Sequence, residues 1–577
     1  MSTPEPAGGG SALSRRELLR AGAALGLGAG IAGRLSAGRL LGQPARSARS
    51  GVGRPLGPPS NPSGARGLGP NGSILPPGTR PFPHLPPGTA SIPQIEHIVV
   101  MMMENHSFDD HLGMLGRGDG LTLGPDGKPV NYNPDPNGGY VRSYHLPDTC
   151  VPGPSQVTQT WDASHICWDH GTNMGFVTGC GATSMGYWDA TDLPYYYSLA
   201  SQFPIGDRYF CSVMAQTYPN RRFLIAATAY GDVSTGPQGI SQTEPPGGTI
   251  FDTLDDHGIT WKDYYPDLPT CALFLPVFYR NVDKGRLAHI NEFLSDAAAG
   301  KLPSFSLVDP YTLYSEEHGD ISVGEAFAAR IIDAVLDSPL WEKTALVLVY
   351  DEHGGWYDHV PPQPAVQPDN VPPEIDVPPD QPGAYDYTGF RVPCIVVSPW
   401  ARRDYVSHQV FDHTSILKLI ETKWNLPALT YRDANANDMT DFFDFSSSTP
   451  PFADPPRLTA PQNPLVGPLP ASSSASGFHP LCTSRPGYTL PPAQYHTPAK
   501  PPNADALIAA HSRQALGLGS GTSPAGANPV GGSSGSDTPV IIGGVAGGVV
   551  VLGGAALLAA RRRGGRLATE GSTTDSP

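Results

Sequence analysis

The stretch that decides the fold is residues 95–110, which read IEHIVVMMMENHSFDD. The apolar run at 95–103 is bounded by a proline before and a polar cluster after, and this pattern predicts a buried β-strand. In open α/β sheets, ligands bind beyond the carboxyl ends of the strands. Glu104 and Asn105, which follow the predicted strand directly, therefore mark a candidate site.

A second stretch of the same design lies at 344–350, reads TALVLVY, and ends in Asp351-Glu352-His353. A partly periodic helical pattern precedes it at 322–336, and a third apolar run follows at 394–398. Helices that alternate with short, continuous apolar strands indicate an α/β sheet covered on both faces. We therefore expect the two polar clusters to meet at one edge of a central sheet.

The composition places one foldable region between two low-complexity flanks. The chain has 577 residues, of which 39% are hydrophobic, enough for a sizeable core. We expect a single domain at 93–445, with disordered linkers on both sides: a Pro/Gly-rich linker at 39–92 and a Pro/Ser/Gly-rich tail and tether at 446–539. Within that tail, residues 503–515 are expected to form a short helix.

The formal net charge of −16 disfavours nucleic acid as a partner. Binding a polymer of phosphates requires clustered lysine and arginine, and the sequence has no such cluster outside its termini.

The N-terminus carries the pattern of a twin-arginine export signal. Arg15 and Arg16 precede an uncharged Ala/Gly/Leu run at 21–33. The alternative, a short amphipathic surface helix, is disfavoured by the glycines in that run. We expect a signal over 1–38 and the twin-arginine translocase as a transient partner.

Near the C-terminus, residues 540–560 contain no charged side chain and are followed by Arg561-Arg562-Arg563. Such a segment is long enough to span a bilayer, and the positive-inside rule keeps the basic tail at 561–577 cytoplasmic. A glycine-rich buried helix is the alternative. The sequence thus predicts a single-pass protein of the cell membrane with its main domain on the outside.

The seven cysteines show no C-x-x-C pair and no zinc-ribbon spacing, so a structural zinc site of that type is not expected. An exported domain can form disulfides, and two of Cys150, Cys167 and Cys180 are candidates for one. The odd total leaves at least one thiol without an internal partner.

The two polar clusters offer oxygen ligands that suit a hard or borderline divalent cation. Taken alone, either cluster is more often a solvated loop with a helix cap. Between them lies Gln216-Thr217-Tyr218-Pro219-Asn220-Arg221, in which Pro219 and Asn220 favour a turn. Thr217 is then displayed at a loop or a helix start, either as a hydroxyl that a metal or base activates or as an N-cap.

These motifs together resemble the bacterial phosphoesterase family of secreted phospholipases C and acid phosphatases, within the alkaline-phosphatase-like superfamily. The resemblance covers about residues 94–445 in the family's order. Besides the clusters above, it rests on GYW at 186–188, DLPYYY at 192–197, DRYFCS at 207–212, SPLW at 338–341, YDEHGGWYDHV at 350–360, RVP at 391–393 and HTS at 413–415. It implies an alkaline-phosphatase-like central sheet sandwiched by helices, in a single catalytic domain.

The resemblance also implies roles for individual residues. Thr217 would be the nucleophile, forming a phosphothreonine intermediate on a divalent metal, Zn or Ca, that is held by Glu104, Asn105, Thr217, Asp351 and Glu352. Proton transfer would fall to His165, His318 and His359, although a structural role is open for each. Substrate contacts would come from Asn220, His353 and Trp356.

Aromatic side chains near the clusters leave a further choice open. Trp356, Tyr357, Trp161 and Trp168 would form a cage for a choline-like cation, or would serve in the core or at the rim of the site.

The sequence departs from the family pattern at His106, where many members have arginine, and at Gly319, where many have proline. The β-rich C-terminal modules of the larger phospholipases are also missing from its Pro/Ser-rich tail. These departures leave the expected metal ligands intact but make the substrate harder to assign.

The leading hypothesis is an exported phospholipase C acting on a membrane phospholipid. The alternative is an acid phosphatase acting on soluble phosphomonoesters. A second alternative, a catalytically inactive cell-surface binding protein, predicts loss of the nucleophile or a ligand, and none is missing.

Overall fold

The computed structural model of the protein describes residues 73–150, 157–236, 239–311, 320–470 and 495–518. All of them belong to one compact unit, Met1–Ser520, while the second unit, Gly521–Pro577, lies outside the described residues.

The membrane location expected from the sequence is corrected by the structure. Among the described residues, no helix is both long enough and apolar enough to cross a membrane. The expected span at 540–560, the basic tail at 561–577 and the export signal at 1–38 all lie outside those residues. The export signal therefore stays a prediction.

An eight-stranded mixed sheet forms the centre of the described unit, with the order β12-β6-β11-β10-β1-β9-β7-β8. Its strands are β1 (His97–Met103), β6 (Ile205–Gly206), β7 (Trp261–Tyr265), β8 (Leu287–His289), β9 (Phe305–Val308), β10 (Thr344–Tyr350), β11 (Cys394–Val397) and β12 (Val406–Ser407). Strands β10, β1, β9, β7 and β8 run parallel, and β11 is antiparallel to β10.

The two strands expected from the sequence lie side by side at the middle of this sheet. Residues His97 to Met103 of β1 pair in register with Thr344 to Tyr350 of β10. Both strands are covered on both faces, which explains why their side chains are apolar without alternation. Because the register is exact to the last pair, Glu104 and Asp351 leave the sheet at the same level.

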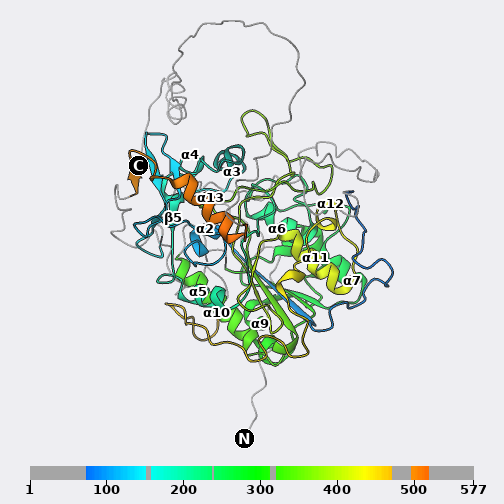
Figure 1. Ribbon diagram of the computed structural model, residues 1–577. Coiled ribbons are helices and arrows are strands. Elements are labelled where there is room, and N and C mark those ends of the chain that lie inside the picture. Colours follow the sequence, from blue (N-terminus) through cyan, green and yellow to red (C-terminus); the bar gives the residue numbers. More distant parts are fainter. Residues whose placement is uncertain (1–72, 151–156, 237–238, 312–319, 471–494, 519–577) are drawn as a thin grey trace, which may run out of the picture. The chain divides into compact units, whose positions relative to one another are not determined.

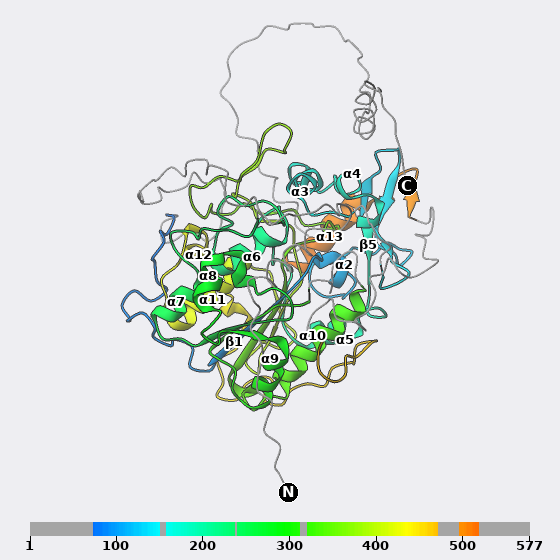
Figure 2. The same cartoon turned by 180° about the vertical axis from the view of Figure 1, so that it is seen from behind.

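Helices cover both faces of the sheet (Figures 1 and 2). One side carries α5 (Pro194–Gln202), α9 (Ile290–Ala298) and α10 (Ile321–Leu336), and the other carries α6 (Thr217–Ala226), α7 (Ile250–Asp256) and α11 (His413–Trp424). The helix expected at 322–336 is thus confirmed as α10, which Asp320 caps by accepting a hydrogen bond from the Ser322 amide. The expected central α/β sheet between helices is confirmed as a mixed sheet.

Shorter elements surround this sheet. The remaining α-helices of the described residues are α2 (Phe108–Leu112), α3 (Trp161–Trp168), α4 (Phe176–Cys180), α8 (Leu275–Asn281), α12 (Tyr431–Ala434) and α13 (Ala504–Ala515). Short 3-10 turns occur at Asp169–Gly171, Ala182–Met185, Thr270–Leu273, Trp341–Lys343 and Thr440–Phe442. Two small sheets are built from β2 (Tyr132–Pro134), β3 (Tyr140–Arg142) and β13 (His496–Thr497), and from β4 (Tyr144–His145) and β5 (Gly186–Tyr187).

The C-terminal segment packs on the domain, and its helix α13 confirms the one expected at 503–515. Ala504 of that helix is buried against Val130 and Tyr132. Farther along α13, the Ser512 hydroxyl donates a hydrogen bond to Asp119 Oδ1 at 2.9 Å.

The described part of the expected linker, 73–92, also packs on the domain. The Asn425 side chain accepts a hydrogen bond from the Phe82 amide and donates to the Phe82 carbonyl, and Asn435 makes the same pair of bonds with Leu75. These buried amides order a segment that has too few apolar residues to fold by itself, so the ordered chain begins before residue 93.

The cysteines differ from the expectation. Cys150 is disulfide-bonded, whereas Cys167 and Cys180 are free thiols whose sulfur atoms lie 3.2 Å apart. A disulfide between two of these three cysteines is therefore not present in the structure.

Candidate active site

The carboxyl ends of three neighbouring strands bring acidic side chains together. Glu104 follows β1, Asp351 follows β10, and Asp309 follows β9. The buried guanidinium of Arg221, from α6, donates to all three: Nε to Asp351 Oδ2 at 3.0 Å, Nη1 to Asp309 Oδ1 at 2.9 Å and Nη2 to Glu104 Oε1 at 3.2 Å. One arginine thus offsets part of the negative charge that the sheet edge collects.

A cluster of oxygen atoms lies beside this arginine. The Asn105 amide nitrogen of the backbone donates to Asp351 Oδ1 at 3.1 Å. One terminal atom of the Asn105 side chain lies 2.5 Å from Glu352 Oε1 and 3.2 Å from Asp351 Oδ1. Thr217 Oγ1 lies 3.4 Å from Asn105 Oδ1. Asn105, Thr217, Asp351 and Glu352 therefore lie close together, and Glu104 is linked to them through Arg221.

The convergence has two chemical explanations. If the Asn105 side chain presents its nitrogen to the carboxylates, it donates a hydrogen bond to each. If it presents its oxygen, side-chain oxygens of Asn105, Thr217, Asp351 and Glu352 face one another at close range, which is favourable only around a cation. An all-oxygen donor set at buried strand ends fits a divalent metal.

Backbone geometry holds this cluster closed. Asn105 has a positive φ of 67°, and Gly354 and Gly355 follow the β10 cluster with φ of 64° and 84°. A Cβ atom at Gly354 would collide with the Asn105 carbonyl oxygen, and one at Gly355 would lie 2.5 Å from the Thr158 amide. Glycine at 354 permits the close approach of the two strand-end loops, and glycine at 355 permits that of the Thr158 backbone.

Thr217 is the first residue of α6, and the helix N-cap is Gln216. The Thr217 hydroxyl therefore does not cap the helix, in contrast to the N-cap role that the sequence left open. Because an N-terminal helix end favours negative charge, an ionised hydroxyl or a phosphoryl group is stabilised at this point.

The first comparison with known proteins decides the family. A model of the phosphoesterase family matches residues 95–427, which is more than half of the chain and contains every residue of the oxygen cluster. The chain belongs to the phosphoesterase family. It is therefore a hydrolase that acts on phosphoric esters.

Named relatives agree with this membership. "Phospholipase C A" of Mycobacterium tuberculosis (strain ATCC 25618 / H37Rv) is 32% identical over 443 residues, covering 67% of this chain and 83% of that protein. "Non-specific phospholipase C1" of Arabidopsis thaliana is 33% identical over 395 residues, covering 60% of this chain and 71% of that protein.

Among solved structures, a protein in the alkaline phosphatase superfamily from Vibrio parahaemolyticus aligns with a TM-score of 0.29 and 11% identity, over 56% of this chain and 76% of that chain. A likeness this distant does not bear on the site.

Two of the residues expected to contact the substrate of this phosphoesterase, Asn220 and His353, are buried. Asn220 is fully buried, and its Oδ1 accepts from the Ser212 and Val213 amides at 2.8 and 3.1 Å, so it braces the loop before Thr217. The His353 ring packs on Phe390, and burial lowers its pKa to about 3.

Two of the four rings expected to form an aromatic cage, Trp356 and Tyr357, lie in the core. Trp356 is fully buried between Trp188 and His106, with ring centroids at 5.1 and 5.7 Å. Tyr357 is buried against Phe176. Neither ring faces the surface, so the structure places both in the core.

The histidines expected to move protons have separate surroundings. Trp161 stacks on His165, whose Nδ1 bonds to the Trp161 carbonyl at 2.8 Å, and burial lowers the pKa of this histidine. No hydrogen bond joins His165 to Thr217 among the described residues. His318 lies outside them.

His359 is held between two carboxylates, Asp109 Oδ2 at 2.7 Å from Nδ1 and Asp119 Oδ1 at 3.2 Å from Nε2. Burial alone would lower its pKa, but these carboxylates raise it to about 10. Both ring nitrogens are engaged, so the structure gives His359 the role of a buried cation in a network with Arg391 rather than that of a free acid or base.

Three residues near the cluster were missed from the sequence. Arg221 and His413 lie inside recognised motifs, and the His413 Nε2 atom bonds to the Asp351 carbonyl at 2.7 Å. Asp309 follows β9, whose four residues FSLV are too short a run to single out. A search for polar residues after every short apolar run would have found Asp309.

Proposed function

We propose that the chain is a metal-dependent phosphodiesterase of phospholipase C type, with Thr217 as its nucleophile. The observation that carries this proposal is the position of the Thr217 hydroxyl, at the start of α6 and 3.4 Å from Asn105 Oδ1 in the oxygen cluster. The phospholipase C names of the relatives support the substrate class.

The metal ligands proposed are Glu104, Asn105, Thr217, Asp351 and Glu352, and Zn²⁺ or Ca²⁺ is the proposed ion. When bound, such an ion acts as a Lewis acid that favours the ionised hydroxyl and the charge that develops on the phosphoryl oxygens.

The chain's own groups prepare Thr217 for attack. Asn220 fixes the loop before it, and the N-terminal end of α6 favours the ionised hydroxyl electrostatically. Thr217 Oγ1 attacks phosphorus, the diacylglycerol oxygen leaves, and water then releases the phosphorylated head group from the threonine.

His165 is proposed as the group that exchanges protons in these steps. Its lowered pKa keeps the ring neutral near pH 7, as a general base requires. Its Nδ1 bond to the Trp161 carbonyl fixes the ring, which leaves Nε2 as the reacting nitrogen. His318 remains a second proposal for this role.

The experiment measures diacylglycerol release from phosphatidylcholine vesicles and p-nitrophenol release from p-nitrophenyl phosphate. Wild type is compared with Thr217→Val, which keeps the shape and removes the hydroxyl, and with Thr217→Ser, which keeps a hydroxyl. We expect diacylglycerol release that falls by at least about 10³-fold in Thr217→Val and with a chelator, and by much less in Thr217→Ser.

The other outcomes have clear meanings. Turnover of the monoester alone would replace the phospholipase with an acid phosphatase. No turnover of either compound by wild type would overturn the proposal and favour a catalytically inactive binding protein. Equal loss in both threonine variants would show that the hydroxyl is not what matters at this position.

A further inference from the structure

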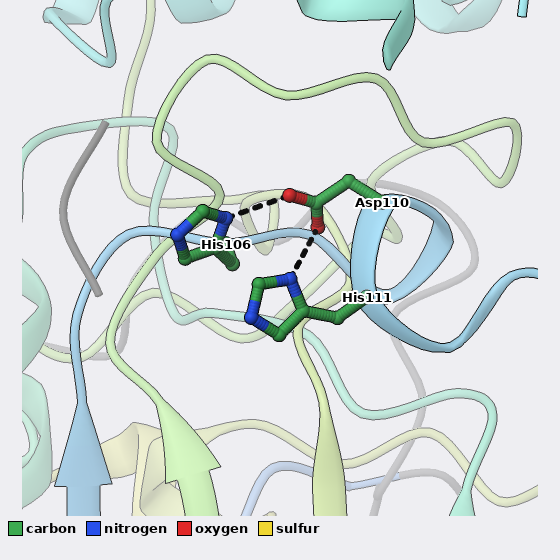
Figure 3. A group of neighbouring side chains, drawn as sticks. All are labelled: His106, Asp110 and His111. Atoms are coloured by element: carbon green, nitrogen blue, oxygen red, sulfur yellow. Dashed lines mark hydrogen bonds and ion pairs between the residues drawn. The ribbon is translucent and has the colours of Figure 1, made fainter. Parts of the chain in front are cut away.

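A group of side chains that could hold a metal ion lies around the start of α2. It consists of His106, Asp110 and His111 (Figure 3). His106 Nδ1 lies 2.7 Å from Asp110 Oδ2, and His111 Nδ1 lies 3.4 Å from Asp110 Oδ1. The two imidazole rings face each other with centroids 4.1 Å apart, so both Nδ1 atoms point toward one carboxylate.

This triad is almost completely removed from solvent, with 0% of His106 and 1% of Asp110 and of His111 exposed. Its walls are aromatic: Trp188, Tyr196, Tyr350 and Trp356 lie around the two rings. In such a dry site a carboxylate is stable only with compensating positive charge. Burial tends to raise the pKa of Asp110, but the neighbouring His106 and His111 lower it below its usual value.

His111 supplies the observation that points to a ligand. Among the described residues its Nε2 has no hydrogen-bond partner, and its Nδ1 has only the long 3.4 Å contact with Asp110 Oδ1. A neutral imidazole carries one N–H and one lone pair, and burying either of them with no partner or with only a long contact is unfavourable. A metal at Nδ1 would satisfy the lone pair.

We propose that His106, Asp110 and His111 bind a first-row transition-metal ion, Zn²⁺ in the first place, at a site separate from the oxygen cluster of the candidate active site. Two imidazoles and one carboxylate select zinc and similar ions over calcium or magnesium. Ligands at about 2.0–2.1 Å from a tetrahedral zinc lie about 3.3 Å from one another. The contacts of 2.7 and 3.4 Å bracket this spacing, so small side-chain rotations suffice.

Two other groups of acidic and histidine side chains lack this combination. Asp109, Asp358 and His359 surround Arg391, which donates to Asp109 Oδ1 at 2.9 Å and to Asp358 Oδ1 at 2.8 Å, so a cation is already in place. His145, Asp189 and Asp192 lie at the surface, where water screens their charges.

Neighbouring contacts hold the triad in position. The Ser107 hydroxyl accepts from the Asp110 amide at 3.2 Å and donates to the Tyr357 carbonyl at 2.7 Å, and the Asp110 carbonyl accepts from the Trp188 amide at 2.9 Å. Such outer contacts are typical of metal sites, where they orient the ligands. The ion would fix the loop that carries Glu104 and Asn105, and its role is therefore structural.

The test measures the zinc content of the purified full-length chain by mass spectrometry, together with the ligand-field absorption of the cobalt-substituted protein. The background is Glu352→Gln, which removes a proposed ligand of the catalytic ion. In this background we expect about one equivalent of zinc, which falls at least about five-fold on His111→Gln. His145→Gln, the same change in the surface group, is the matched control and should retain the ion.

Asp110→Asn provides a second variant in case His111→Gln does not fold. Zinc content that is the same with and without His111→Gln would overturn the proposal. If neither variant folds, the cobalt spectrum of the Glu352→Gln protein decides: a four-coordinate spectrum supports the site, and the spectrum of hydrated cobalt refutes it. None of these readouts depends on turnover, so the proposal stands or falls independently of the phospholipase activity.

Discussion

Replacing Arg221 with methionine tests the charge balance at the strand ends. The side chain makes three ion pairs of 2.9 to 3.2 Å with Asp309, Asp351 and Glu104, all of them buried. Removing one partner of a buried pair costs about 3–5 kcal/mol, because an uncompensated charge remains. Since one guanidinium serves three carboxylates, we expect a loss of unfolding free energy at or above the upper end of that range.

The neighbouring Arg222 gives a matched control on the same helix. It is also buried, but its ion pair with Asp232 is single and 3.4 Å long, and its other donors go to the carbonyls of Ala229 and Gly239. Arg222→Met therefore leaves one carboxylate and two carbonyl groups without their donor, rather than three carboxylates, and should cost less, about 1–3 kcal/mol.

Urea unfolding followed by tryptophan fluorescence, with a chelator present, measures both variants at pH 7 and pH 5. Burial raises the pKa of Asp351 and Arg221 opposes this rise, so its removal raises the pKa further in the folded state. A group with a raised folded pKa contributes stability below its unfolded pKa and loses it as pH rises. The loss of unfolding free energy in Arg221→Met should therefore be smaller at pH 5 than at pH 7. A deficit below about 1 kcal/mol, or one equal to that of Arg222→Met at both pH values, would refute this reasoning.

Three further outcomes are expected. The two aspartate partners of His359 raise its pKa from 6.5 to about 10, so the stability it contributes is complete below pH 6.5 and is lost as pH rises through about 10. The unfolding free energy of wild type should therefore fall more between pH 7 and pH 10 than that of His359→Gln, and parallel curves for the two proteins would contradict this. Burial raises the pKa of Glu325 from 4.5 to about 8, so the stability that this residue contributes is present below pH 4.5 and is lost as pH rises through about 8. Glu325→Gln should therefore have a higher melting temperature than wild type at pH 9 and the same melting temperature at pH 4, and a lower melting temperature at pH 9 would contradict this. Gly354→Ala should destabilise the fold by several kcal/mol more than Gly78→Ala, because both glycines have positive φ but a Cβ atom meets the Asn105 carbonyl only at Gly354; equal melting temperatures would show that the two strand-end loops adjust.

The middle of the sheet could be read from the sequence because β1 and β10 are continuous apolar runs. The flanking strands were harder. β7 reads WKDYY, and its Lys262 and Asp263 interrupt any apolar pattern, although Asp263 is fully buried and accepts from the Cys271 amide. The third run was recognised as a strand, but nothing in four apolar residues indicates that β11 lies antiparallel to β10.

Residues at strand ends could be predicted, and residues that approach from elsewhere could not. Asp351 and Glu352 are visible because they end an apolar run, whereas Arg221 looks like any helical arginine until three carboxylates are found around it. Trp356 suggested a binding surface because it follows a polar cluster. Its burial depends on Trp188, from a distant part of the chain, and no local pattern reports that contact.

The position of β1 in the middle of the sheet has a consequence for synthesis. Its two neighbours, β9 and β10, begin about 200 and 240 residues after β1 ends. At about 5–20 residues per second, the ribosome needs about 10–50 s to deliver them. During that time the apolar residues of β1 have both hydrogen-bonding edges open to other nascent chains. The yield of folded protein should therefore depend on chaperone capacity and translation speed more than on the stability of the finished fold.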